Sequence, residues 1–295
     1  MKLYKTTITP QSNFSTALKG DTLFGQMCWA VRYAFGNERL KSLLNNYATE
    51  PFLIVSDGFA RGYLPKPSMP GRYLNEDPDQ KKQNRKRVWL SMDALKKGHY
   101  AEAKTDKDIG NVKKRASVVR NAINYKSSTT GGKGFDPYGE DETALSEQEI
   151  YFLVSDAFGL DELKEAFALL SGMGYGKDSS IGKGRFEVGE FTELPDSESA
   201  STFMALSPFA PSNLQNETLF YEPFTRFGKS GAARANTHPF KKPILLADCG
   251  AVIHFAEKKV LHYVGQAIVN ISSYDDTVHQ GYAIVLPIKE LPNGS

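Results

Sequence analysis

The order of strand-like and helix-like segments over residues 2–191 constrains the fold more than any other feature of this sequence. Residues 2–10, KLYKTTITP, alternate apolar and polar side chains as a strand does. Residues 20–36 follow with helical spacing, and Asp21 or Thr22 is the predicted N-cap. The apolar face of this helix consists of Leu23, Phe24, Met27, Val31 and Ala34. A second helix is predicted over residues 37–47, and a buried strand over residues 51–67.

Strand, helix and strand patterns return later in the chain, at residues 149–158, 160–170 and 185–191. The later helix has Leu160, Leu163, Phe167 and Leu170 at helical spacing. The combined order is strand, helix, strand, strand, helix, strand. This order is typical of a ferredoxin-like fold, in which both helices cover one face of an antiparallel sheet. Between the two runs, residues 68–145 are basic and polar, and we interpret them as an insertion.

The polar stretch at residues 193–201 ends this first unit, and strand patterns dominate the chain after it. We therefore expect an α+β protein of two domains. The first covers residues 1–197, with the insertion at about 68–145 and a glycine-rich loop at 171–185, and the second is a β-rich domain over residues 198–295. No internal repeat is visible in the sequence.

Composition narrows the class of protein. With 36 basic and 34 acidic residues the net charge is only +2, so binding of a polyanion requires a local basic patch. Cys28 and Cys249 stand far apart without a metal-binding pattern, which indicates a reducing cytoplasm and neither disulfide nor metal. No long apolar run suggests secretion or a membrane span, and no cofactor is expected.

The glycine-rich loop, SGMGYGKDSSIGKGRF, follows directly after the later helix. A P-loop is excluded, because Ser171 occupies the position of the first glycine and Asp178 follows the lysine. Two interpretations stay open. The glycines at 172, 174 and 176 cap a helix and form a tight turn with positive φ, or the loop cradles RNA phosphates. In the cradle, Ser179 and Ser180 donate hydrogen bonds while Lys177, Lys183 and Arg185 neutralise charge.

Other chemistry has weaker support. The histidines, His99, His238, His254, His262 and His279, are scattered and form no catalytic motif, although His99 in the insertion is a conceivable general base for RNA cleavage. Basic runs such as KKQNRKRVW are commonly solvated surface. The aromatic residues among them offer stacking platforms for unpaired bases, and they are Trp89, Tyr100, Tyr125, Phe135 and Tyr138.

Five segments together resemble the fourth Csm subunit of type III-A CRISPR effector complexes, a group of RAMP proteins in antiviral defence. They are residues 17–44 with KGDTLFG, 52–67, 120–142, 163–188 with the glycine-rich loop, and 281–289 with GYAIVLPIK. The resemblance spans nearly the whole chain, and the order of KGDTLFG and the loop carries its specificity. This chain differs from the family in residues 120–142, which resemble the family's thumb region: Asn124 and Tyr125 stand in place of an expected acid and arginine.

The resemblance implies a non-catalytic RNA-binding subunit of two ferredoxin-like (RRM-like) domains with a thumb in the first. Such a subunit grips the repeat-derived 5′ handle of the crRNA and contacts the large polymerase and nuclease signature subunit and the first backbone RAMP subunit. The loop residues expected to line the handle are Gly174, Gly176, Lys177, Ser179, Ser180, Gly182 and Lys183, with Arg185 close by.

Further RNA contacts are expected outside the loop. Lys19 and Asp21 stand at a helix N-terminus and either face RNA or support the loop. Arg120 and Lys126 of the thumb supply phosphate contacts, and the basic segment 222–240 adds Arg226, Lys229 and Arg234.

Two alternatives remain at this point. The chain is a RAMP endoribonuclease that cuts CRISPR repeat RNA, or it is the equivalent handle-binding subunit of a type III-B complex.

Overall fold

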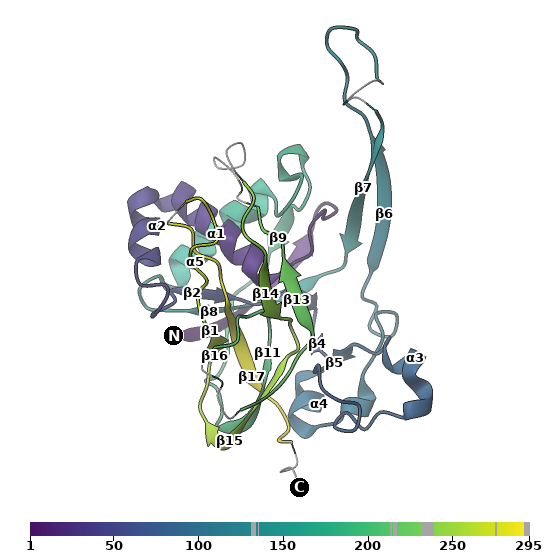
Figure 1. Ribbon diagram of the computed structural model, residues 1–295, viewed down its shortest axis with the longest axis vertical. Coiled ribbons are helices and arrows are strands. Elements are labelled where there is room, and N and C mark those ends of the chain that lie inside the picture. Colours follow the sequence, from purple (N-terminus) through teal and green to yellow (C-terminus); the bar gives the residue numbers. More distant parts are fainter. Residues whose placement is uncertain are drawn as a thin grey trace.

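A computed structural model (Figure 1) describes residues 1–130, 134, 136–212, 214, 217–229, 231, 239–274 and 276–291. It contains antiparallel sheets and helices, so the predicted α+β class is correct. None of the helices in these ranges is long and apolar enough to cross a bilayer.

The first half is built on one antiparallel sheet of six strands. They are β1 (Lys2–Pro10), β2 (Leu53–Val55), β3 (Phe59–Ala60), β8 (Gln148–Val154), β9 (Phe186–Val188) and β10 (Thr192–Glu193). The order is β10-β1-β8-β2, with β9 also paired to β1 and β3 to β8. β1 and β8 run together from Lys2 opposite Val154 to Ile8 opposite Gln148. These two strands therefore form the centre of the sheet.

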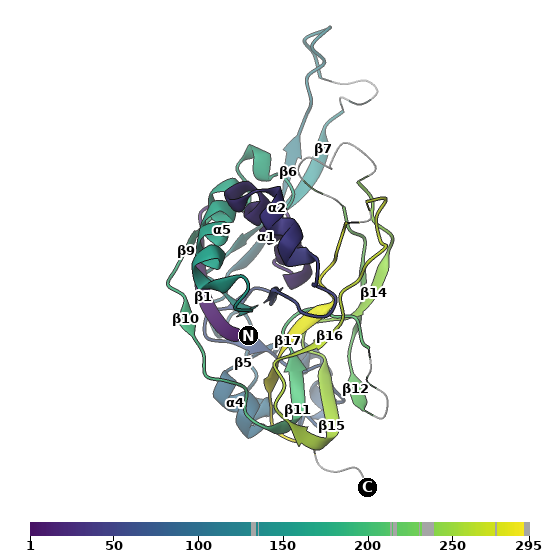
Figure 2. The same cartoon turned by 90° about the vertical axis from the view of Figure 1, so that its left-hand side faces the viewer.

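Three helices accompany this sheet: α1 (Gly20–Phe35), α2 (Asn37–Leu44) and α5 (Gly159–Met173). Figure 2 shows α1, α2 and α5 gathered together, and α1 and α5 contact one another. The predicted apolar face of α1 is confirmed for Leu23, Phe24, Met27 and Val31, which are buried, whereas Ala34 is half-buried. The predicted N-cap is wrong. The N-cap residue is Lys19, no side chain caps the helix, and the Asp21 carboxylate is turned into the interior, where it pairs with Arg226.

The insertion consists of two parts. The first, which we call the insertion lobe, spans residues 64–104 and contains β4 (Leu64–Pro65), η1 (Pro78–Gln80), α3 (Lys81–Asn84), β5 (Trp89–Leu90), α4 (Met92–Lys97) and η2 (Tyr100–Glu102). Leu74, Leu90 and Leu95 are buried in it, so the lobe packs on the main core. The second, the arm, is the hairpin of β6 (Lys113–Arg120) and β7 (Tyr138–Leu145), which projects from the body (Figure 1).

The second half contains a five-stranded antiparallel sheet of order β12-β15-β11-β17-β16. Its strands are β11 (Ala200–Ala205), β12 (Thr218–Phe220), β15 (Val252–Lys259), β16 (Tyr263–Gly265) and β17 (Tyr282–Pro287), and a hairpin of β13 (Pro223–Arg226) and β14 (Ile244–Ala247) lies beside it. No helix occurs among the described residues after 198, so a second ferredoxin-like domain stays a prediction. Leu206, Tyr282 and Ile284 join the apolar cluster of the first half, and the core is continuous across the expected domain boundary.

Candidate nucleic-acid interface

A cleft of about 900 Å³ lies between α1 and α2 on one side and loops of the second half on the other. Five residues predicted from the sequence line it together, although they come from three distant segments: Asp21, Gly176, Lys177, Arg226 and Lys229. Figure 2 shows β14 at the right of the molecule and α1 and α2 to its left. The fold therefore unites the helix N-terminus, the glycine-rich loop and the basic segment after β13.

The charged side chains that line this cleft are mostly cationic. The cations are Arg32, Lys41, Lys177, Arg226, Lys229 and Lys241, against the acids Asp21 and Asp276. Trp29 also lines it, with the Arg32 guanidinium 5.2 Å from the centre of its ring. A concave surface lined by one sign of charge concentrates the field and attracts polyanions. This is the local patch that a chain of net charge +2 needs in order to bind nucleic acid.

Asp21 forms the buried floor of the cleft. Its carboxylate accepts two hydrogen bonds of 2.6 Å from the Arg226 guanidinium, and His279 Nε2 lies 3.3 Å from its Oδ2. Burial alone would raise the pKa of Asp21, but its interactions with His279 and Arg226 hold it well below its ordinary value. Asp21 and Arg226 thus neutralise one another and join α1 to β13.

Lys19 is held in a second network directly beside the first. Its Nζ lies 3.0 Å from Asp57 Oδ2 and 2.6 Å from Asp248 Oδ1. Burial opposes the charge of Lys19, yet the two carboxylates raise its pKa above the ordinary value. Burial raises the pKa of Asp57 to about 6, against the opposing effects of Lys19 and of the Gly20 amide. Lys19 and Asp21 were expected either to face RNA or to support the loop. Their contacts with charged side chains inside the protein are those of supporting residues.

The glycines of the loop are required by its conformation. Gly174, Gly176, Gly182 and Gly184 all have positive φ. A Cβ at Gly184 would stand 2.0 Å from the carbonyl oxygen of Tyr175, and one at Gly174 would stand 2.4 Å from that of Lys183. The cap-and-turn interpretation is therefore correct for Gly174 and Gly176, and it is wrong for Gly172, which lies inside α5 and has no positive φ.

Most backbone amides of the loop bond within the protein. The amide of Gly176 donates to Gln26 Oε1, that of Lys177 to Thr16 Oγ1 at 2.9 Å, and that of Arg185 to Ser12 Oγ at 2.9 Å. These amides shape the loop against the segment before α1. What the loop offers outward is its side chains, together with the turn of η3 (Ser179–Ile181), where Ser180 is exposed.

The loop is also joined to the arm by ion pairs. Lys177 Nζ lies 2.6 Å from Glu140 Oε1, Arg120 Nε lies 3.0 Å from Glu140 Oε2, and Lys183 pairs with Glu142. The hydrogen bond from Lys177 lowers the pKa of Glu140, and that from Lys183 lowers the pKa of Glu142. The predictions from the sequence missed both glutamates. Their spacing of two residues on a strand, which points both to one face, was the available signal.

The remaining predicted residues are more dispersed. Lys126 lies in the turn of the arm between β6 and β7 and is exposed, as is Arg185. Lys229 is exposed with its Nζ 4.6 Å from the centre of the Phe240 ring. Arg234 lies outside the described residues, and so do Phe135 and His238.

Two of the aromatic stacking platforms suggested for the insertion are wrong. Trp89 and Tyr100 are buried in the core, where Trp89 Nε1 donates to Asp106 Oδ1. Tyr125 and Tyr138 of the arm are 96% and 50% exposed, so they can stack on a base. His99 is exposed on the insertion lobe, with its Nδ1 3.2 Å from Glu102 Oε1. In the described ranges, no group of three or more His, Cys, Asp or Glu side chains could hold a metal ion.

No protein-family model matches this sequence, and no curated protein matches it either. Solved structures do match it over its full length. Csm4 in a crystal structure of a Csm1–Csm4 cassette with AMPPNP is 18% identical, with a TM-score of 0.64 and all of both chains covered. Csm4 of a Csm3–Csm4 subcomplex from the type III-A CRISPR–Cas interference complex is 17% identical, with a TM-score of 0.61 and 98% of this chain and 99% of that one covered. The chain therefore has a Csm4-like fold, as the sequence motifs predict.

Proposed function

We propose that this chain is a non-catalytic subunit of a type III-A CRISPR effector complex and that its cationic cleft binds the repeat-derived 5′ handle of the crRNA. The observation that carries the proposal is the convergence of three separate predicted segments on this one cleft, in a chain with a Csm4-like fold. Phosphate contacts fix the register of an RNA, and an unpaired strand can splay its bases into adjacent pockets.

The cleft divides its charges between two roles. Asp21 and Arg226 are shielded from water and satisfy one another, so they fix the shape of the floor. Lys177 is exposed, and ion pairs between exposed side chains are weak because water and salt screen them. An RNA phosphate can therefore replace Glu140 as the partner of Lys177. Lys229 and Arg32 form no ion pair in the described part of the chain, and they provide further cations.

The partners follow from the same proposal. The matched Csm4 chains come from assemblies with Csm1 and with Csm3. For this chain we infer the corresponding partners, a large signature subunit that carries polymerase and nuclease activities and a backbone RAMP subunit. The arm, with Arg120 at the end of β6 and Lys126 in its turn, would lie near the junction of handle and guide.

Equilibrium binding tests the proposal, using RNA with the host's 5′ handle and a scrambled RNA of equal length at two salt concentrations. We expect a preference for the handle that persists at the higher salt, with the RNA intact afterwards. Replacing Lys177 and Lys229 by alanine should weaken binding and reduce the salt slope by ~0.7 for each phosphate that these lysines no longer neutralise. The double variant Lys2→Ala, Lys5→Ala is the matched control, because it removes two ion-paired lysines outside the cleft.

An unchanged affinity and salt slope in the Lys177 and Lys229 variant would refute the assignment of the cleft. Cleavage of the RNA without metal would favour the endoribonuclease alternative. Co-purification with the cognate large subunit distinguishes a type III-A from a type III-B assembly.

A further inference from the structure

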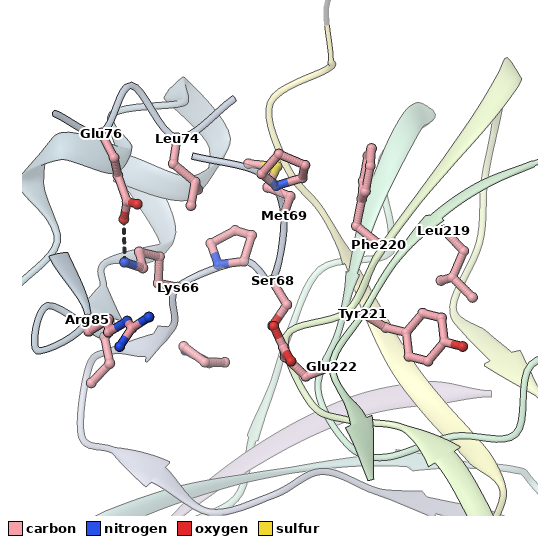
Figure 3. A pocket seen from close by; sticks show the side chains of 14 residues that line it. Lys66, Ser68, Met69, Leu74, Glu76, Arg85, Leu219, Phe220, Tyr221 and Glu222 are labelled. Atoms are coloured by element: carbon pink, nitrogen blue, oxygen red, sulfur yellow. Dashed lines mark hydrogen bonds and ion pairs between the residues drawn. The ribbon is translucent and has the colours of Figure 1, made fainter. Parts of the chain in front are cut away.

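A second cavity, of about 820 Å³, opens between the insertion lobe and the second half (Figure 3). One wall is the rigid segment Pro65–Pro70, which contributes three prolines and Met69, backed by Leu74 and Val88. The opposite wall is the consecutive run Leu219, Phe220, Tyr221 and Glu222. This groove shares no lining residue with the cationic cleft.

The second wall is an open edge of a sheet. β12 is the terminal strand in the order β12-β15-β11-β17-β16, so within the described residues the backbone groups on its outer side have no strand partner. Leu219 and Phe220 of this edge strand line the groove, together with Tyr221 and Glu222, which follow the strand. An extended peptide can add to such an edge through main-chain hydrogen bonds while alternate side chains enter the pocket.

The chemistry of the pocket favours large apolar side chains. Tyr221 lines the groove and is 44% exposed, and Figure 3 shows Phe220 on the wall opposite the segment that carries Met69. Aromatic residues and methionine exposed in a concave surface are typical of the buried centre of protein interfaces.

The rim of the groove is strongly basic. Arg85 lines it and belongs to a run of exposed cations that includes Lys81, Lys82, Lys86 and Arg87. None of these five cations forms a salt bridge with an acid in the described ranges. Lys66, deeper in the groove, does form one, with its Nζ 2.5 Å from Glu76 Oε1 (Figure 3). The free charge of the rim is therefore complementary to carboxylates.

We propose that this groove docks an extended segment of a protein partner in which apolar and acidic side chains alternate, and that the segment pairs with the edge of β12. Its apolar side chains fill the pocket beside Tyr221, and its carboxylates meet Arg85 and the cations next to it. A peptide fits better than RNA because the groove offers a strand edge, which pairs with peptide backbone. The site goes beyond the proposed RNA handle function.

Selection from a random-peptide display library against the full-length protein tests the proposal. We expect enriched sequences with alternating apolar and acidic residues, and synthetic peptides of those sequences should bind in fluorescence anisotropy. Arg85→Glu should weaken that binding by roughly tenfold or more and alter its salt dependence, and Tyr221→Ala should weaken it to a similar degree. Both side chains are at the surface, so folding is expected to be retained. Arg115→Glu, which reverses an exposed charge on the arm, is the matched control and should bind as the unmodified protein does.

Three outcomes would overturn the proposal: no enriched pattern, peptides whose binding is indifferent to Arg85→Glu and Tyr221→Ala, or binding of an unrelated single-stranded RNA that Arg85→Glu abolishes while Lys177→Ala leaves it intact. The last outcome would assign the groove to nucleic acid. Handle binding is measured separately with Lys177→Ala, so failure here is distinguishable from failure of the proposed function.

Discussion

Replacing Arg226 by methionine should destabilise the protein strongly. The Asp21 side chain is inaccessible to solvent, and Arg226 supplies two hydrogen bonds of 2.6 Å to it. Removing one partner of a buried ion pair leaves a charge without compensation, which costs about 3 to 5 kcal/mol. Because His279 remains 3.3 Å from the carboxylate, we expect a value near the lower end. With a urea m-value of about 3 kcal/mol per M, the unfolding midpoint falls by roughly 1 M.

The effect should depend on pH in a defined direction. In the unmodified protein the pKa of Asp21 is lowered, so its stabilising contribution is present above the unfolded-state pKa of about 3.9 and is lost below it. In the variant, burial without Arg226 raises this pKa, and protonation relieves the penalty as pH falls from 7 towards 4. The difference in unfolding free energy between the two proteins should therefore shrink on acidification.

Urea unfolding followed by circular dichroism and tryptophan fluorescence measures this difference at several pH values. The variant Asp21→Asn, Arg226→Met removes both charges and should recover much of the stability. Arg61→Met is the control, because Arg61 pairs with Glu147 at 2.7 Å at the surface and its loss should matter little. If Arg226→Met lowers the unfolding free energy by less than about 1 kcal/mol at pH 7, or if the loss does not shrink in acid, Asp21 and Arg226 do not form a buried charged pair.

Two further predictions concern the loop and its support. Gly184→Ala should destabilise the protein far more than Gly182→Ala in thermal unfolding. At both positions a positive φ costs about 1 to 2 kcal/mol, but only at Gly184 would the added Cβ strike the backbone. The pKa of Asp57 is raised to about 6, so between pH 7 and pH 5 the unmodified protein should gain stability relative to Asp57→Asn as the folded state takes up a proton. Equal pH profiles in urea unfolding would contradict this assignment.

Local periodicity predicted the elements of the first half well. The apolar spacing of residues 20–36 selected four side chains of α1 that are buried, and the alternation of residues 2–10 marked the central strand β1. These patterns succeed because burial of one face is decided by neighbours within a few residues. The N-cap of α1 failed because the conformation of Asp21 is decided by Arg226, which lies 205 residues away.

The candidate site was predictable in composition and not in geometry. The sequence marked Lys177 and Lys183 as cations of a glycine-rich loop, and it contained no sign that Glu140 and Glu142 of the arm would pair with them in particular. Long-range ion pairs have no local signature. Any exposed acid can pair with a lysine, so the residue types alone do not show which acid will be the partner. The same holds for the amide of Lys177, which bonds to Thr16 in a segment without a clear pattern.

The proposed binding of a polyanion by a nearly neutral chain depends on the two classes of ion pair around the cleft. A phosphate competes for a cation only when the existing partner of that cation is weak. Arg226 is not available to a phosphate, because it forms a bidentate pair with the buried Asp21. Lys19 is not available either, because it pairs with Asp57 and Asp248. Lys177 and Lys229 are exposed, so they carry the charge available to RNA. Affinity should therefore respond to these two lysines and stability to the buried pairs, which separates binding from folding in the same cleft.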